Sequence, residues 1–106
     1  MSRYAARTSV PVARSKEAIE AVLARYGATK FASGWDGDRA VIQFEAESRR
    51  VRFELHLPVQ PERGRERWEQ QCRQRWRCLV LVIKAKLVAV ESSIETFEES
   101  FMAHLV

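Results

Sequence analysis

Residues 68–105 carry apolar side chains at intervals of three or four positions, which is the period of an α-helix. At about 100° per residue, these positions all fall on one side of a helix. They are Trp68, Cys72, Trp76, Leu79, Ile83, Leu87, Val90, Ile94, Phe97, Phe101 and Leu105. The pattern therefore predicts a long helical region over residues 63–105.

The same region contains one signal for a break. The segment Ser92-Ser93-Ile94-Glu95 matches a capping box, in which a serine and a glutamate cap the start of a new helix. The uninterrupted helical phase slightly favours one continuous helix, whereas the capping box favours two. Both interpretations stay open at this point, with the continuous helix as the first.

Two different periods mark the part of the chain before this region. Ser15 is a good N-cap for a helix, and Gly27 is suited to close that helix in the left-handed conformation. From Lys30 onward the period changes to two, with a tight-turn signal at Asp36-Gly37. The alternating apolar residues of the two following strands are Ala40, Ile42 and Phe44, then Val51, Phe53, Leu55 and Leu57. We expect a three-stranded antiparallel meander with one apolar and one charged face.

These elements predict an α+β fold. With 106 residues, the chain is long enough for one hydrophobic core and therefore for a single domain, 1–106. We expect an extended arm over residues 1–13, then an N-terminal helix and the three-stranded meander within 15–58. The long C-terminal helix, either continuous or broken near Ser92, packs on the sheet.

The formal net charge of +4 is unevenly distributed. Residues 49–86 hold eleven basic and four acidic side chains, an excess of +7, whereas residues 87–106 hold four acidic and no basic ones. Such an excess attracts phosphate groups or an acidic protein surface, and the planar guanidinium of arginine suits bidentate contacts to phosphate. We expect nucleic acid or a partner to bind Arg63, Arg65, Arg67, Arg73, Arg75, Arg77, Lys84, Arg50 and Arg52.

Two tryptophans, Trp68 and Trp76, lie among these arginines. An exposed indole can stack on an unpaired base. Both residues also belong to the apolar stripe, which favours core packing over stacking. We expect Trp76 and Ile83 to pack on the apolar face of the sheet.

The residue types needed for common enzyme chemistry are sparse. The two histidines, His56 and His104, are not close in sequence to Cys72 or Cys78, and we expect both cysteines to be buried thiols. The chain has no glycine-rich phosphate loop and no CxxC or HExxH spacing. Asp36-Gly37-Asp38 is better explained as a turn than as a cation site. We expect no enzymatic activity, no cofactor and no metal.

The charge pattern of the long helical region suggests self-association. One flank is basic at Arg73, Arg77 and Lys84 and then acidic at Glu91, Glu95 and Glu98, which makes it complementary to its own antiparallel copy. The apolar segment near the midpoint predicts a homodimer interface at Leu81, Val82 and Val88. A break at Ser92 permits the same pairing within one chain.

No targeting or membrane segment is apparent. The longest wholly apolar run, Cys78 to Ile83, is far shorter than a membrane span, and residues 1–12 contain no apolar block of signal-peptide length. We expect a cytoplasmic protein without a membrane partner.

Several segments resemble a family of small proteins encoded in bacteriophage and prophage genomes, most of them described as hypothetical. The resemblance covers nearly the whole chain. It rests on Arg25-Tyr26-Gly27-Ala28, Gly34-Trp35, Val51-Arg52-Phe53, Arg75-Trp76-Arg77, Ile83-Lys84-Ala85-Lys86-Leu87 and Thr96-Phe97-Glu98-Glu99. It implies a phage setting, and with it a host-cell cytoplasmic location, but no particular activity. The order helix, three strands, helix is also that of double-stranded-RNA-binding domains, without their lysine signature at the last helix.

The sequence therefore favours a non-enzymatic phage-type binding protein. Its arginine-rich helix would engage nucleic acid or a complex that handles nucleic acid. The alternative function is inhibition of a host defence complex by protein–protein contact, as small anti-CRISPR proteins do; this rests on analogy of setting.

Overall fold

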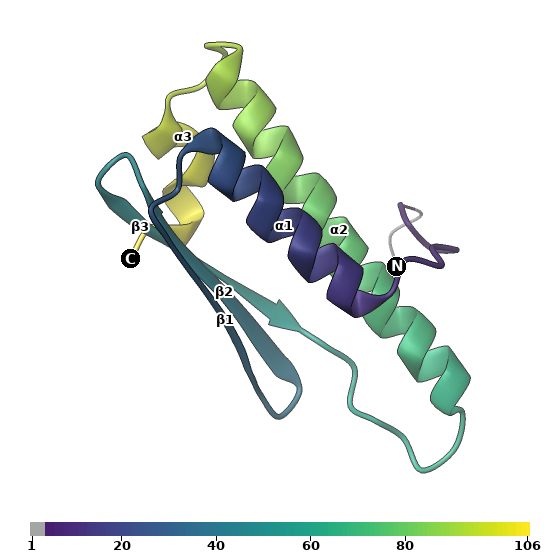
Figure 1. The fold of residues 1–106 in the computed structure, drawn as a ribbon. Coiled ribbons are helices and arrows are strands. Elements are labelled where there is room, and N and C mark those ends of the chain that lie inside the picture. Colours follow the sequence, from purple (N-terminus) through teal and green to yellow (C-terminus); the bar gives the residue numbers. More distant parts are fainter. Residues whose placement is uncertain (1–3) are drawn as a thin grey trace.

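A computed structural model describes residues 4–106 of the chain and confirms the α+β class (Figure 1). The order of elements is helix, three strands and then helices. Their bounds are α1 (Val12–Tyr26), β1 (Lys30–Asp36), β2 (Arg39–Ala46), β3 (Arg49–His56), α2 (Arg65–Glu91), α3 (Phe97–Phe101) and the 3₁₀-helix η1 (Met102–His104).

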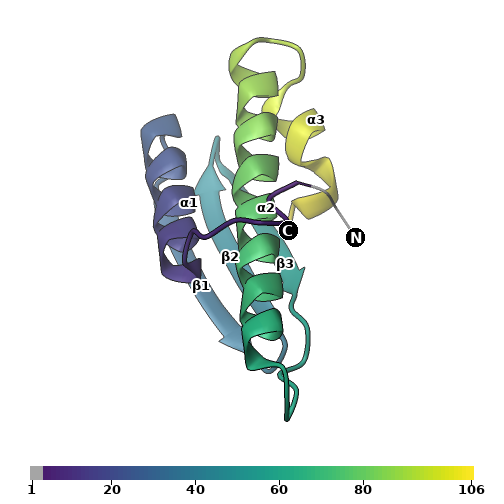
Figure 2. The same ribbon diagram turned by 90° about the vertical axis from the view of Figure 1, so that its right-hand side faces the viewer.

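The three strands form an antiparallel sheet in the order β1-β2-β3, as the alternating pattern predicts. Both long helices cover one face of this sheet, and the other face is open (Figures 1 and 2). The inward residues of β2 and β3 are buried: Ala40, Ile42, Phe44, Ala46, Val51, Phe53 and Leu55. Because their neighbours in sequence point to the open face, that face carries the charged side chains.

Helix α1 begins earlier than the start predicted from Ser15. Pro11 is the N-cap with an extended backbone, and the helix starts at Val12 rather than after Ser15. Proline lacks an N–H and has a fixed φ, so it is tolerated at a helix start. Ser15 is a buried residue within the helix, and its hydroxyl has no hydrogen-bond partner. The predicted end is confirmed, because Gly27 takes the left-handed conformation with φ 112°.

The long helical region is broken, so the first interpretation, a continuous helix, is wrong. Helix α2 ends at Glu91, and Ser93 adopts a left-handed conformation with φ 60°. The capping box that starts α3 is formed by Thr96 and Glu99, not by Ser92 and Glu95: the Thr96 hydroxyl accepts from the Glu99 N–H at 3.1 Å, and Glu99 Oε1 accepts from the Thr96 N–H at 2.9 Å. Hydrogen bonding to its carboxylate, from the Thr96 backbone N–H and then from the Thr96 side chain, lowers the pKa of Glu99.

The break allows the end of the chain to fold back into the core. Phe101 is fully buried, with its ring edge-on to those of Phe44 and Phe53 at centroid distances of 5.8 and 6.2 Å. Beyond it, Leu105 forms a bridge with Val51 of β3. A straight continuation of α2 would carry these apolar side chains away from the sheet, so their burial stabilises the reversal.

The segment before α1 differs from the expected extended arm over residues 1–13. Residues 1–3 lie outside the described part, residues 4–7 form a turn, and α1 takes the end of the range. The segment before α1 lies against the outer side of α2. The side-chain amide of Gln70 donates to the Thr8 carbonyl at 2.9 Å and to the Ala6 carbonyl at 3.2 Å. The Cys78 thiol donates to the Tyr4 carbonyl at 3.3 Å.

The C-terminal histidine predicts a loss of stability in acid. The His104 ring stacks on Phe53 with centroids 4.0 Å apart. Burial, followed by the positive charge of Lys86, lowers the pKa of His104 below its usual 6.5. The unfolded chain then binds the proton more readily, so the free energy of unfolding falls as the pH drops below about 6.5 toward the folded-state pKa. We expect the melting temperature of His104→Gln to fall less than that of the wild type over this range.

The control for this measurement is His56→Gln, because His56 is exposed on the open face of the sheet. Thermal denaturation followed by circular dichroism at several pH values should show the wild-type acid response in this variant. An identical acid response in His104→Gln and the wild type would contradict the prediction.

Candidate nucleic-acid interface

The predicted cations of the helical region lie at the start of α2 and along it. Gly64 precedes the helix in a left-handed conformation with φ 78°, which glycine adopts without steric strain. Arg63, Arg65, Arg67, Arg75 and Lys84 are exposed, and Arg73 and Arg77 are half-buried.

Three of these cations form one strip. At about 100° per residue, Arg73, Arg77 and Lys84 lie within a ~40° arc and span ~16 Å along the helix. Figure 2 shows α1 and α3 on opposite sides of α2. Lys86 marks the α3 side, because its Nζ donates to the Ser100 carbonyl at 2.8 Å. The strip therefore lies on the side toward α1. We call Arg73, Arg77 and Lys84 the basic strip.

No carboxylate lies within ion-pair distance of the basic strip among residues 4–106. Arg73 Nε donates to the side-chain oxygen of Gln70 at 3.1 Å, and the same Gln70 holds the segment before α1. This contact orients one edge of the guanidinium without neutralising its charge. The strip therefore keeps three positive charges available for an anion.

The other arginines of α2 are arranged differently. Arg65 Nε pairs with Glu69 at 2.9 Å, one helical turn away. Arg75 Nε donates to the His56 carbonyl at 3.1 Å, on the opposite flank of the helix from the strip. Arg63 and Arg67 are exposed and extend the basic surface toward the start of the helix.

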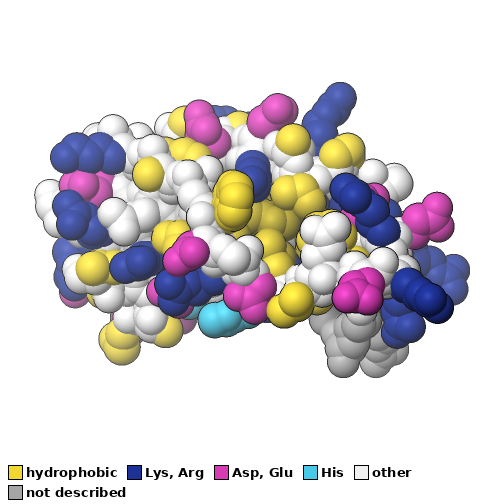
Figure 3. All heavy atoms as spheres, turned by 90° about the horizontal axis from the view of Figure 1, so that it is seen from below, with side chains coloured by type: hydrophobic (Ala, Val, Ile, Leu, Met, Phe, Trp, Pro, Cys, Tyr) yellow, Lys and Arg dark blue, Asp and Glu magenta, His cyan; other side chains and the backbone are white. Residues whose placement is uncertain are grey.

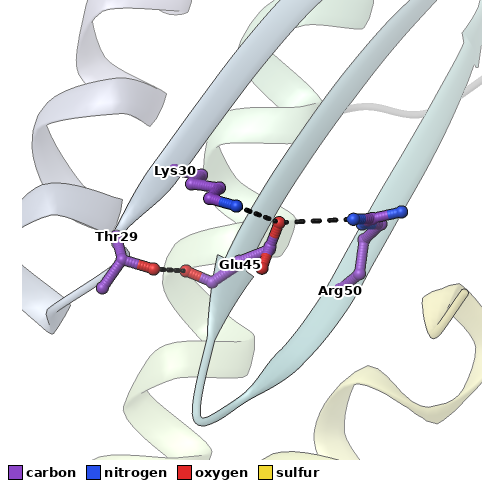
Figure 4. A network of polar contacts seen from close by, with 4 residues as sticks. All are labelled: Thr29, Lys30, Glu45 and Arg50. Carbon is purple, nitrogen blue, oxygen red and sulfur yellow. Dashed lines mark hydrogen bonds and ion pairs between the residues drawn. The ribbon is translucent and has the colours of Figure 1, made fainter.

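The structure does not bring Arg50 and Arg52 together with the basic strip. Both lie on the open face of the sheet, and α2 covers the other face. Arg50 shares the Glu45 carboxylate with Lys30, each at 3.5 Å (Figure 4), and Arg52 lies 3.9 Å from Glu54. The sheet thus separates these cations from the helix, and carboxylates partly cancel their charge.

The prediction of core packing is confirmed for Trp76 and not for Trp68, which lies outside the core cluster. Trp76 is 2% exposed, and the Lys16 ammonium lies 5.0 Å from its ring centroid. Trp68 is half-buried and donates its indole N–H to the Pro58 carbonyl at 2.7 Å. The buried Trp76 ring is therefore not available to stack on a base. Trp35 lies opposite the buried Ala40 and is nevertheless 74% exposed, which the two-residue period of the strand does not reveal.

The predicted dimer residues form an apolar patch on the outer side of α2, away from the sheet. Leu81, Val82 and Val88 are 39%, 43% and 59% exposed. Leu81, Val82, Ala85 and Tyr4 also border a shallow pocket of about 270 Å³. The charge complementarity behind the predicted helix pairing does not continue past Glu91, because Glu95 lies in the turn and Glu98 of α3 pairs with Arg49 at 3.0 Å.

One pocket has a histidine and a cysteine among its lining residues. It has a volume of about 410 Å³ and lies between the end of β3 and α2, with His56, Arg75 and Cys78 in its lining. Cys78 is half-buried, not buried as expected, and its thiol donates to the Tyr4 carbonyl rather than to an imidazole. Cys72 is buried as predicted, and burial raises the pKa of its thiol.

A second hollow lies at the end of the molecule that is at the bottom of Figure 1. Figure 3 views this end directly and shows hydrophobic side chains gathered there, with charged side chains around them. A pocket of about 390 Å³ at this end has Gly37, Leu57, Val59 and Trp68 in its lining and no arginine. Among residues 4–106, no group of three His, Cys, Asp or Glu side chains is placed to hold a metal ion. No helix in this range is long and apolar enough to cross a membrane.

A scan against protein-family models and searches of curated proteins and of solved structures found no match to this chain.

Proposed function

We propose that this chain is a non-enzymatic phage-type protein of the host-cell cytoplasm that binds nucleic acid, or a complex that handles nucleic acid, through α2. The observation that carries this proposal is the basic strip. Arg73, Arg77 and Lys84 lie along one side of a rigid helix without a carboxylate partner among the described residues. The cations of the sheet face share carboxylates and are less suited to this role.

The strip fits a nucleic-acid backbone. Its span of ~16 Å exceeds the ~3.4 Å between successive phosphates of one strand, so three side chains can contact separate phosphates. Because Trp76 is buried and Trp68 is half-buried, we propose that the binding energy comes mainly from phosphate contacts rather than base stacking. We therefore propose binding without strong sequence preference.

The test is the salt dependence of binding to a DNA duplex and to a single strand. Each phosphate contact adds about 0.9 to the slope of log affinity against log salt for duplex DNA. We expect the variant with Arg73, Arg77 and Lys84 all changed to Gln to bind more weakly and to lose up to about 2.7 from this slope. Titration of fluorescently labelled DNA at several salt concentrations measures both effects.

The matched control changes Arg39, Arg50 and Arg52 to Gln. It removes the same three charges, taking the net charge from +4 to +1, but from the ion-paired face of the sheet. We expect this variant to keep most of the wild-type slope. Equal losses in the two triple variants would mean that net charge, and not the basic strip, determines binding.

A second candidate function is contact with a host protein, as in the inhibition of a defence complex. The apolar patch formed by Leu81, Val82 and Val88 favours it, because exposed apolar side chains grouped on one helix are typical of protein interfaces. The test is a pull-down with nuclease treatment. A partner that is retained by the variant with Arg73, Arg77 and Lys84 changed to Gln, and lost by Leu81→Glu, would favour this function over nucleic-acid binding.

A further inference from the structure

The two edges of the sheet differ in what covers them. At β3, the Val106 N–H donates to the Arg50 carbonyl at 2.9 Å, and Arg75 Nε donates to the His56 carbonyl at 3.1 Å. At β1, no segment among residues 4–106 other than β2 is paired with the strand. An open edge of seven residues without proline is a template for pairing with another strand.

The hairpin register determines which backbone groups of β1 point outward. Asp36 lies opposite Arg39 across the two-residue turn Gly37-Asp38, and the residues that close such a turn exchange hydrogen bonds. Because the bonded residues alternate along the strand, the backbone groups of Phe31, Ser33 and Trp35 point away from β2. These three residues supply the free donors and acceptors of the edge.

The sequence of β1 is complementary to itself when one copy is turned antiparallel about Ser33. Phe31 then lies opposite Trp35 of the second copy, and Lys30 lies opposite Asp36 of the second copy. Both arrangements are favourable cross-strand pairs. A slip of one residue would turn the outward backbone groups away from each other, and a slip of two would separate the aromatic rings.

We propose that β1 pairs with β1 of a second copy in this register, so that two three-stranded sheets join into one sheet of six strands. The two-fold axis passes between the Ser33 residues, perpendicular to the sheet, so both helix layers lie on the same face. Pairing would cover Trp35, which is 74% exposed in the single chain. The proposal does not depend on nucleic-acid binding, because the basic strip lies on α2.

The β1 edge is better matched to a second copy than the apolar patch of α2 is. The patch has exposed apolar side chains, but the acidic residues that would complement its basic flank are not on the helix beyond Glu91. The edge combines aligned backbone groups, opposite charges at both ends and aromatic side chains between them. These features specify the partner, its orientation and its register.

The test is a charge exchange measured by sedimentation equilibrium. We expect the wild type to form a dimer, and Lys30→Asp and Asp36→Lys each to weaken it about tenfold or more, since like charges then face each other at both ends of the paired strands. An equimolar mixture of the two variants should restore the dimer, because each unlike charge pair is re-formed between them. Restoration also shows that both variants are folded.

The control is Leu81→Glu in the α2 patch, which we expect to leave the dimer intact. Hydrogen exchange gives a second measurement: the amides of Phe31, Ser33 and Trp35 should become protected as the protein concentration rises. A wild type that is monomeric at all accessible concentrations would overturn the proposal. A dimer that dissociates in Leu81→Glu but persists in the two charge variants would also overturn the proposal, because self-association would then lie on α2.

Discussion

Replacing Trp76 with alanine is expected to lower the free energy of unfolding by about 3–5 kcal/mol, the usual range for truncating a large buried aromatic side chain. Trp76 is 2% exposed and belongs to the core cluster that joins α2 to the sheet, together with Ile83, Phe44 and Phe53. Its neighbours come from several elements, so they are restrained from collapsing into the space left by the indole. Urea denaturation followed by circular dichroism measures the loss.

Trp35→Ala is the matched control, because it removes the same side chain from a position that is 74% exposed. At a protein concentration low enough to avoid pairing through β1, its effect should stay within about 0.5 kcal/mol, as for most surface substitutions. A loss below about 1 kcal/mol for Trp76→Ala would show that the indole is not part of the core. Trp76 would then become a candidate for stacking on a base.

The sheet and the two long helices could be predicted because each buries one face, and burial of one face imposes a period on the sequence. Ala40, Ile42 and Phe44 repeat every second position because successive side chains of a strand point to opposite faces. Trp76, Ile83 and Leu87 repeat every three or four positions because α2 turns the same side to the sheet.

The helical period favours a continuous helix over a break after Glu91, because the period reflects the spacing of apolar residues and not their burial. Ile94 keeps the helical phase but is 76% exposed in the turn between α2 and α3. The correct signal was present at Thr96 and Glu99, which also have capping-box spacing. Ser92 and Glu95 match the same pattern, and local sequence alone does not distinguish two adjacent matches.

Part of the candidate site could be predicted from the sequence and part could not. The alignment of Arg73, Arg77 and Lys84 follows from helical geometry and could be predicted. The pairing of Arg65 with Glu69, one turn away on the same helix, follows from the same geometry, but the partners of Arg75 and Arg50 could not be predicted because they come from other elements. Arg75 donates to a carbonyl of β3, and Arg50 of β3 pairs with Glu45 on the neighbouring strand β2.

Replacing Phe101 with alanine is expected to cost a similar 3–5 kcal/mol. The side chain is fully buried, and its ring lies 4.8 Å from that of Phe97 in addition to its contacts with Phe44 and Phe53. Truncation would leave a cavity walled by three aromatic rings, two of them on the sheet, which is a rigid surrounding. Urea denaturation measures the loss, with Met102→Ala as the neighbouring exposed control, expected within about 0.5 kcal/mol.

The same variant distinguishes the broken helix from a continuous one. In the folded-back arrangement, loss of the Phe101 ring should also loosen the residues that follow it, so the Val106 amide that bonds to Arg50 should exchange faster with solvent. A helix that continued past Glu91 would carry Phe101 away from the sheet into water, and its truncation would then cost less than about 1 kcal/mol with no change at Val106. The size of the loss therefore decides whether the end of the chain completes the core.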